Sequence, residues 1–221
     1  MASFRIRPYR EEDYDAARSL FIRGILEHAP TEYRLFLRSA WTQLGLLVLF
    51  VGARAAMGCW VLGLGTVALA LVATWLQVRA FVTSYVQQSL ATDMRDISAS
   101  YLKTPDSCFW VAESGGCVVG TVGATPAQDS EAAMELKRMS VSKEHRGQGI
   151  AKALIGEVLR FARARGYGAV MLTTSNVQVA AQKLYEGQGF RKVAAYAPSL
   201  LATLLRFKLF RYRYDLPGGT A

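Results

Sequence analysis

The apolar positions of this chain are concentrated in one long segment of its first half. Between Trp41 and Val78 the only charged residue is Arg54, whereas the sequence on either side has the charge density of a water-soluble protein. As helices, residues 55–78 would span about 36 Å and residues 41–53 about 20 Å, against a hydrocarbon core of ~30 Å. The segment therefore predicts a membrane element, and a buried helix in a soluble core is the less favoured alternative.

Strand-like and helix-like patterns flank this segment. Residues 4–9 alternate as in a short strand, and apolar positions between 16 and 26 recur at helical spacing, which predicts a helix ending near His28, before Pro30. A second amphipathic helix is expected over residues 90–101. The later sequence predicts strands at 109–112, 118–123 and 134–141, a helix at 150–165, a strand at 169–173, a helix at 179–188 and a closing pair of strands. This order predicts an α+β fold with a mixed central β-sheet flanked by helices.

The position of the apolar segment restricts how it can cross a bilayer. If residues 4–9 join the later strands in one sheet, the chain must cross the membrane an even number of times or not at all. We therefore expect a helical hairpin between the first two helices, turning near Arg54–Gly58, with a single span as the alternative. The chain would then divide into residues 1–40, holding the first strand and helix, a membrane hairpin at 41–82, and the rest of the domain at 83–221.

Charge modifies this picture without pointing to nucleic acid. The formal net charge is +9, and residues 191–221 hold six basic residues against one acidic residue. Arg34, Arg38 and Arg79 border the apolar segment, where basic residues are expected on the cytoplasmic side. The sequence has neither zinc-ligand spacing nor a basic reading helix, so we expect no nucleic-acid partner. With three widely spaced cysteines and two histidines, we also expect no disulfide framework and no metal site.

One glycine-containing loop carries the clearest chemical signal. A predicted strand ending at Val141 runs into a loop with Arg146, Gly147 and Gly149, and the loop opens directly into a helix at Ile150. Glycines allow close approach of the main chain, and the N–H groups of a first helical turn favour phosphate. The pattern is neither a P-loop nor a dinucleotide fingerprint. It predicts an anion cradle, the alternative being a simple bend.

At this loop the sequence resembles the GNAT superfamily of acetyl-CoA-dependent N-acetyltransferases. Arg146, Gly149 and Ala151 match its Arg/Gln-x-x-Gly-x-Gly/Ala motif. A second block matches the family's strand-end Asn, following helix and Gly-Phe close, at Asn176, Ala180, Tyr185, Gly189 and Phe190. Residues 27–30, 92–97, 108–113 and 149–154 are similar to the camello-type membrane-bound branch. That branch includes cysteine S-conjugate and aspartate N-acetyltransferases.

The resemblance implies acetyl-CoA as co-substrate and a set of residues around it. Those expected to hold the cofactor are Met139, Val141, Arg146, Gly147, Gln148, Gly149, Ile150, Ala151, Asn176 and Tyr185. Tyr185 would protonate the departing thiolate, Glu135 would act as the base directly or through water, and a backbone N–H near Met139–Val141 would stabilise the oxyanion. Packing is the alternative role for Tyr185, a surface position for Glu135, and helix capping for Asn176.

The substrate amine is less well determined. Glu27 and Asp96 are weaker candidates for the base. Lys137 or Arg138 could hold a substrate carboxylate, with phosphate binding or simple solvation as the favoured alternatives. The main expectation is a small-molecule N-acetyltransferase of the endoplasmic reticulum membrane, facing the cytosol and acting on the α-amine of a cysteine S-conjugate. Aspartate N-acetylation, protein lysine acetylation, and a silent membrane scaffold that binds acetyl-CoA remain open.

Overall fold

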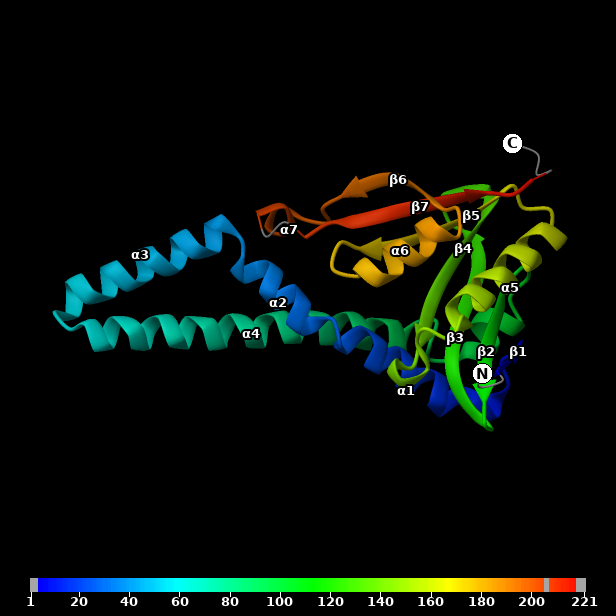
Figure 1. Cartoon of the computed structure of the whole chain (residues 1–221), viewed down its shortest axis with the longest axis horizontal. Coiled ribbons are helices and arrows are strands. Elements are labelled where there is room, and N and C mark those ends of the chain that lie inside the picture. Colours follow the sequence, from blue (N-terminus) through cyan, green and yellow to red (C-terminus); the bar gives the residue numbers. More distant parts are fainter. Residues whose placement is uncertain (1–3, 205–206, 218–221) are drawn as a thin grey trace.

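A seven-stranded mixed sheet forms the centre of the molecule (Figure 1). The computed structural model describes residues 4–204 and 207–217. Arg206, one of the six basic residues counted over residues 191–221, lies outside the described residues. In spatial order the strands are β1 (Phe4–Pro8), β2 (Cys108–Ser114), β3 (Cys117–Ala127), β4 (Ser130–Val141), β5 (Ala169–Ser175), β7 (Leu209–Asp215) and β6 (Arg191–Tyr196). Neighbours are antiparallel except β4 and β5, which are parallel. The expected α+β architecture is confirmed, including the pairing of β1 with the later strands.

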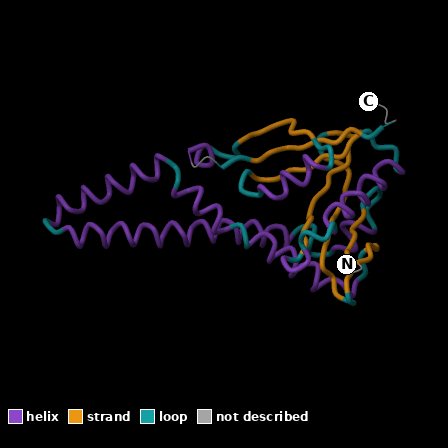
Figure 2. The backbone as a smooth tube through the Cα atoms, in the orientation of Figure 1, coloured by secondary structure: helices purple, strands orange, loops and turns teal. Residues whose placement is uncertain are grey.

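The helices lie on both sides of this sheet and in one long projection (Figure 2). They are α1 (Tyr14–Leu26), α2 (Ala29–Leu37), α3 (Ala40–Met57), α4 (Trp60–Ala91), α5 (Ile150–Ala164), α6 (Val179–Gly187) and α7 (Leu200–Leu204). Shorter helical turns are formed by Glu11–Asp13, Ser98–Leu102 and Lys143–His145. Pro30 lies in the first turn of α2 rather than interrupting α1, as expected for a residue without a main-chain N–H.

Helices α3 and α4 form the predicted hairpin and extend away from the sheet (Figure 1). The turn follows Gly58, whose φ of +65° ends α3 in the left-handed conformation that glycine favours. Both arms are longer than the sequence pattern predicted, because α3 has 18 residues and α4 has 32. Most large apolar side chains of α3 and of the first two-thirds of α4 are exposed.

Helix α4 continues from the hairpin into the globular domain without a break. Its last turns bury Val82, Val86 and Ser89, at the three- and four-residue spacing of one helix face. The separate amphipathic helix expected over residues 90–101 is therefore wrong. Of the buried apolar positions in that stretch, Met94 lies in the turns after α4, and Ile97 directly precedes the short helical turn Ser98–Leu102. Their spacing reflects burial on the core side rather than a helix of their own.

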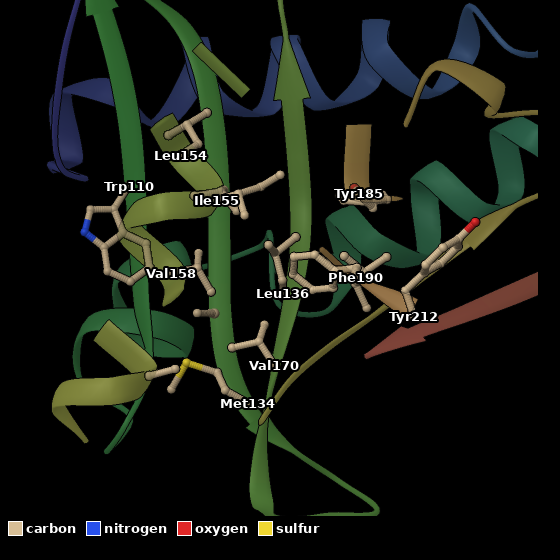
Figure 3. Packing of buried hydrophobic residues seen from close by; sticks show 14 of the residues in the cluster. Trp110, Met134, Leu136, Leu154, Ile155, Val158, Val170, Tyr185, Phe190 and Tyr212 are labelled. Atoms are coloured by element: carbon tan, nitrogen blue, oxygen red, sulfur yellow. The ribbon is translucent and has the colours of Figure 1, made fainter. Parts of the chain in front are cut away.

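Two apolar clusters cover the two faces of the sheet. The larger one packs α5 and α6 on the sheet and includes Leu154, Ile155 and Val158 opposite Trp110 and Leu136 (Figure 3). On the other face, α1 and the end of α4 pack on the sheet around a second cluster of Tyr9, Ala17, Phe21, Val86, Met94, Ile97, Tyr101, Phe109 and Val111. The sheet is thus fixed from both sides, which holds the carboxyl ends of β4 and β5 in place.

Candidate active site

Strands β4 and β5 separate towards their carboxyl ends. They pair only at Ala133 with Ala169, Met134 with Val170 and Glu135 with Met171, although β4 continues to Val141 and β5 to Ser175. From Leu136 onward, β4 has no ladder partner on its β5 side among the described residues. An opening at the carboxyl ends of parallel strands is a common place for ligand binding, because main-chain groups there are unpaired.

A bulge in β4 directs the main chain of Val141 into this opening. The register with β3 shifts between Thr121 and Gly123, and Arg138 has a φ of +56°, in the left-handed region that non-glycine residues rarely adopt. The Thr121 hydroxyl donates to the Arg138 carbonyl oxygen at 3.1 Å. Beyond the bulge, Ser142 N–H donates to the carbonyl of Val119 at 2.8 Å, so the main chain of Val141 points the other way, away from β3.

The loop after β4 brings the anion cradle to the same opening. Gly147 and Gly149 have φ values of +79° and +85°, and a Cβ atom on either residue would meet open space. Helix α5 begins at Ile150 directly after this loop. Because the first N–H groups of a helix lack intrahelical partners and lie at its positive end, the exposed loop can receive a phosphate. The phosphate cradle at this loop stays a prediction.

Arg146 is held at the edge of this cradle by two acceptors. Its Nε donates to the carbonyl oxygen of Val141 at 3.2 Å, and its Nη2 donates to Oε1 of Glu27 at 2.6 Å. The ion pair joins the loop to the end of α1, 119 residues earlier in the chain. Glu27, expected only as a weaker base, therefore lies beside the loop that follows β4.

Tyr185 and Asn176 lie at the β5 side of the opening. Tyr185 is buried on α6 and packs against Phe190 and Tyr212, at ring-centroid distances of 5.9 and 6.1 Å (Figure 3). Burial raises the pKa of Tyr185 well above its ordinary value, which keeps the phenol protonated. The Asn176 Oδ1 atom accepts the Lys208 N–H at 3.2 Å and so joins the end of β5 to the start of β7. The N-cap position of α6 belongs to Gln178, so Asn176 does not take it.

Comparison with known proteins identifies the family. Residues 75–190 match the family described as acetyltransferase (GNAT) family. The chain belongs to the GNAT family of acetyltransferases. It is 42% identical over 222 residues to N-acetyltransferase 8 of Rattus norvegicus, covering 99% of this chain and 100% of the relative. To N-acetyltransferase 8B of Homo sapiens it is 43% identical over 227 residues, covering 100% and 99%.

A solved structure shows the same fold for this acetyltransferase. The GNAT-family acetyltransferase of Staphylococcus aureus Mu50 superposes with a TM-score of 0.57 at 18% identity, covering 97% of this chain and 99% of that one. The predicted resemblance to the superfamily and to its camello-type branch is confirmed, and the chain is an acetyl-transferring enzyme. The roles of its individual residues stay predictions.

The acetyltransferase brings Glu135 and Lys137 together on β4. Lys137 Nζ lies 3.0 Å from Glu135 Oε2, and both side chains are about one-third exposed. Leu136 between them is buried in the α5-side cluster, so the pair lies on the opposite face of the sheet. Lys137 therefore has a carboxylate partner already, and this contact holds Glu135 close to where β4 and β5 separate.

Arg138 is not placed as a free anchor for a substrate carboxylate. Its Nε and Nη2 donate to the two oxygens of Asp93 at 2.8 and 2.6 Å, its Nη1 donates to Ser89 Oγ at 2.8 Å, and its guanidinium lies over the ring of Phe21. Sequence reasoning did not single out Asp93 as the partner of Arg138. No local pattern marks a pair whose members are 45 residues apart in the chain.

Asp96 is the last of the predicted site residues. The Asp96 Oδ1 atom accepts the N–H of Ala99 at 2.7 Å, so this carboxylate caps the turn after α4. It lies close enough to Tyr9 to contribute to the raised pKa of that phenol, after the larger effects of burial and of Glu11 and Asp13. Within residues 4–204 and 207–217, no group of three histidine, cysteine or acidic side chains is arranged to hold a metal.

Proposed function

We propose that this chain is a membrane-bound, acetyl-CoA-dependent N-acetyltransferase that acts on the α-amine of a small amino acid, a cysteine S-conjugate first among them. The observation that carries the proposal is the opening between β4 and β5. The strands that border it lead into the groups that the proposal uses: β4 ends at Val141 and is followed by the loop with Gly147 and Gly149, and β5 is followed by α6 with Tyr185. Thioester aminolysis needs an oxyanion donor, a phosphate site and an acid.

The proposed reaction has two proton transfers, one from the amine to Glu135 and one from Tyr185 to the leaving thiolate. An α-amine has a pKa of about 7.7 to 8.0, so a carboxylate base is sufficient near neutral pH. Glu135 takes the proton from the attacking amine, directly or through a water molecule. The N–H of Val141 stabilises the oxyanion while the new C–N bond forms. Tyr185, which burial keeps protonated, then gives its proton to the thiolate released when the C–S bond breaks.

The hairpin supports a membrane location. Helices α3 and α4 are long and apolar enough to cross a bilayer, and only 0% and 6% of their most apolar windows are buried within the molecule. A core helix of a soluble protein would be mostly buried, so the exposed apolar side chains favour lipid contact. Arg34, Arg38 and Arg79 lie near the base of the hairpin, and Arg54 lies one turn before its tip at Gly58. This distribution favours a domain on the cytosolic side, and the endoplasmic reticulum is the membrane that we propose.

Accessibility labelling tests the topology. Single cysteines at positions 34, 79 and 200 are labelled with a membrane-impermeant reagent in sealed microsomes, in a background with the native cysteines replaced. All three are expected to react, because the ends of a hairpin return to the same side. Opposite accessibility of positions 34 and 79 would contradict the hairpin in the bilayer.

An acetylation assay tests the activity and the substrate. Detergent-solubilised protein is given acetyl-CoA and a panel of S-substituted cysteines, aspartate, other amino acids and a lysine peptide. A cysteine S-conjugate is expected to give the highest kcat/KM. Preference for aspartate or for the lysine peptide would overturn the substrate assignment. Binding of acetyl-CoA with no turnover of any amine would instead favour a silent scaffold.

Tyr185→Phe tests the proposed acid within the same assay. Loss of a general acid is expected to lower kcat by about 10²- to 10⁴-fold with little change in acetyl-CoA affinity. Tyr212→Phe is the matched control, because it removes a neighbouring hydroxyl that bonds to Glu186 Oε1 at 2.7 Å. A Tyr185→Phe enzyme with wild-type kcat would leave Tyr185 only its packing role.

A further inference from the structure

The last turn of α1 is docked closely on the end of β4. A Cβ atom at Gly24 would lie 2.7 Å from Ser140 Oγ, so only glycine lets the helix approach the strand at this point. Ser140 immediately precedes Val141, whose main chain faces the opening. The close approach places Glu27, one turn further along the chain at the end of α1, against the loop that follows β4.

Glu27 fixes the orientation of the Arg146 guanidinium together with a second acceptor. Nη2 of Arg146 donates to Glu27 Oε1 at 2.6 Å, while Nε donates to the Val141 carbonyl at 3.2 Å. Two bonds from different nitrogens define the plane of a guanidinium, whereas one bond leaves it free to rotate. The Arg146 side chain is 45% exposed and stands next to Gly147, so packing alone does not hold it.

The neighbouring His28 does not compete effectively with Arg146 for the carboxylate of Glu27. His28 Nε2 is 3.9 Å from Glu27 Oε1, but burial lowers the pKa of His28 below its ordinary value, and Arg146 lowers it further against the opposing effect of Glu27. A neutral imidazole at pH 7 is a weak competitor for a carboxylate. The guanidinium is therefore the cation that Glu27 holds.

We propose that Glu27 is a positioning residue for the acetyl donor, which holds Arg146 so that its remaining N–H groups meet the pyrophosphate at the start of α5. The inference rests on the proposed binding of acetyl-CoA at this loop. It gives Glu27 a different role from that of a base acting on the amine. A preorganised arginine loses less side-chain freedom when it binds an anion, which strengthens binding without adding a contact to the donor.

The affinity of the full-length, detergent-solubilised protein for acetyl-CoA, measured by titration calorimetry, tests this role. Glu27→Ala is expected to weaken binding by roughly two- to fivefold, the range of a partly exposed ion pair, and Glu27→Gln by less, because its amide oxygen still accepts a hydrogen bond. Glu144→Ala is the matched control, since it removes an exposed carboxylate from the same loop. In an Arg146→Ala background, Glu27→Ala should have no further effect.

A truncated donor separates positioning from chemistry. S-acetylpantetheine carries the thioester but no pyrophosphate, so kcat/KM with this donor should be the same for the wild type and Glu27→Ala. An equal loss with both donors would make Glu27 part of the chemical step and overturn the proposal. Tighter acetyl-CoA binding by Glu27→Gln would also overturn it, because Glu27 would then compete with phosphate for Arg146. Wild-type protein that binds no acetyl-CoA would refute the proposed function itself, whereas normal wild-type binding with unchanged Glu27→Ala affinity refutes only this inference.

Discussion

The ion pair between Arg138 and Asp93 makes the most stringent test of how the active-site strand is held. Asp93→Asn keeps the size of the side chain and removes its charge. In the wild type both carboxylate oxygens accept from Arg138, and Tyr101 Oη also donates to Asp93. Burial alone would raise the pKa of Asp93, but these hydrogen bonds hold it below its ordinary value. The charged form is therefore the one that the fold stabilises.

The expected cost follows from how deeply the pair is buried. Removing one partner of a fully buried pair costs about 3 to 5 kcal/mol, because the other charge remains without compensation. The side chains of Arg138 and Asp93 are 14% and 23% exposed, and Ser89 and the ring of Phe21 still contact the guanidinium, so we expect about 2 to 3 kcal/mol. For a chain of this size each kcal/mol lowers Tm by about 2 to 4 °C, which gives a decrease of roughly 4 to 12 °C.

Thermal unfolding in detergent, measured at several pH values, is the assay. A carboxyl group with a lowered pKa contributes stability above its unfolded-state pKa and loses it as pH falls through the folded-state value. The difference in Tm between wild type and Asp93→Asn should therefore be full at pH 7 and shrink at acid pH. Asp106→Asn is the control, because it removes an ion pair to Arg165 whose side chains are 41% and 49% exposed.

The same variant should lower kcat, because Arg138 occupies the bulge that directs Val141 into the opening. A result that refutes this reasoning is an unchanged Tm together with a raised KM for the amine alone. Arg138 would then be an anchor for the substrate carboxylate, one of the roles that the sequence left open for it, and the bulge would be held by other contacts such as the Thr121 hydroxyl.

Three further perturbations follow from single contacts. Gly149→Glu should abolish acetyl-CoA binding in calorimetry while the protein stays folded by circular dichroism, because a non-glycine residue is strained at φ +85° and the new charge faces the phosphates; unchanged affinity would defeat the cradle. Gly24→Ala should lower the free energy of unfolding by about 1 to 3 kcal/mol and so lower Tm, and adding Ser140→Ala should restore it, because the Oγ atom that meets the new Cβ is removed; no rescue would place the strain elsewhere. Burial raises the pKa of Glu32 to about 7, so wild-type stability should fall as pH rises from 4.5 through 7, and Glu32→Gln should raise Tm at pH 8 but not at pH 4.

Local sequence patterns predicted the parts of this protein that depend on neighbouring residues. The apolar run and its turn at Gly58 follow from composition and from one left-handed glycine. The cradle follows from two glycines before a helix start. Each of these features is formed by residues that are neighbours in the chain, so a local sequence pattern is enough to predict it.

The missing parts depend on residues that are distant in the chain. The separation of β4 from β5 results from how the sheet is packed on both faces, and no stretch of either strand records where their pairing ends. The bulge could be anticipated only as a possibility, because the left-handed conformation falls on Arg138 and is held by Asp93, Ser89 and Thr121. In the sequence these side chains look like ordinary surface residues, because their contacts form only when the chain is folded.

In helix α4 the apolar segment of the sequence ends before the helix itself does. From Trp60 to Val78 its side chains are apolar on most faces, whereas beyond Arg79 only one face is apolar, and Val82, Val86 and Ser89 pack into the domain. A continuous helix rises about 1.5 Å per residue, so the part after Arg79 extends about 18 Å from the hairpin to Ala91, close to Asp93 and the bulge. If the hairpin lies in a bilayer, this helix fixes the height of the opening above the lipid, because it has no flexible joint between its lipid-facing part and its buried part. A flexible linker at residue 82 would have left that height undetermined.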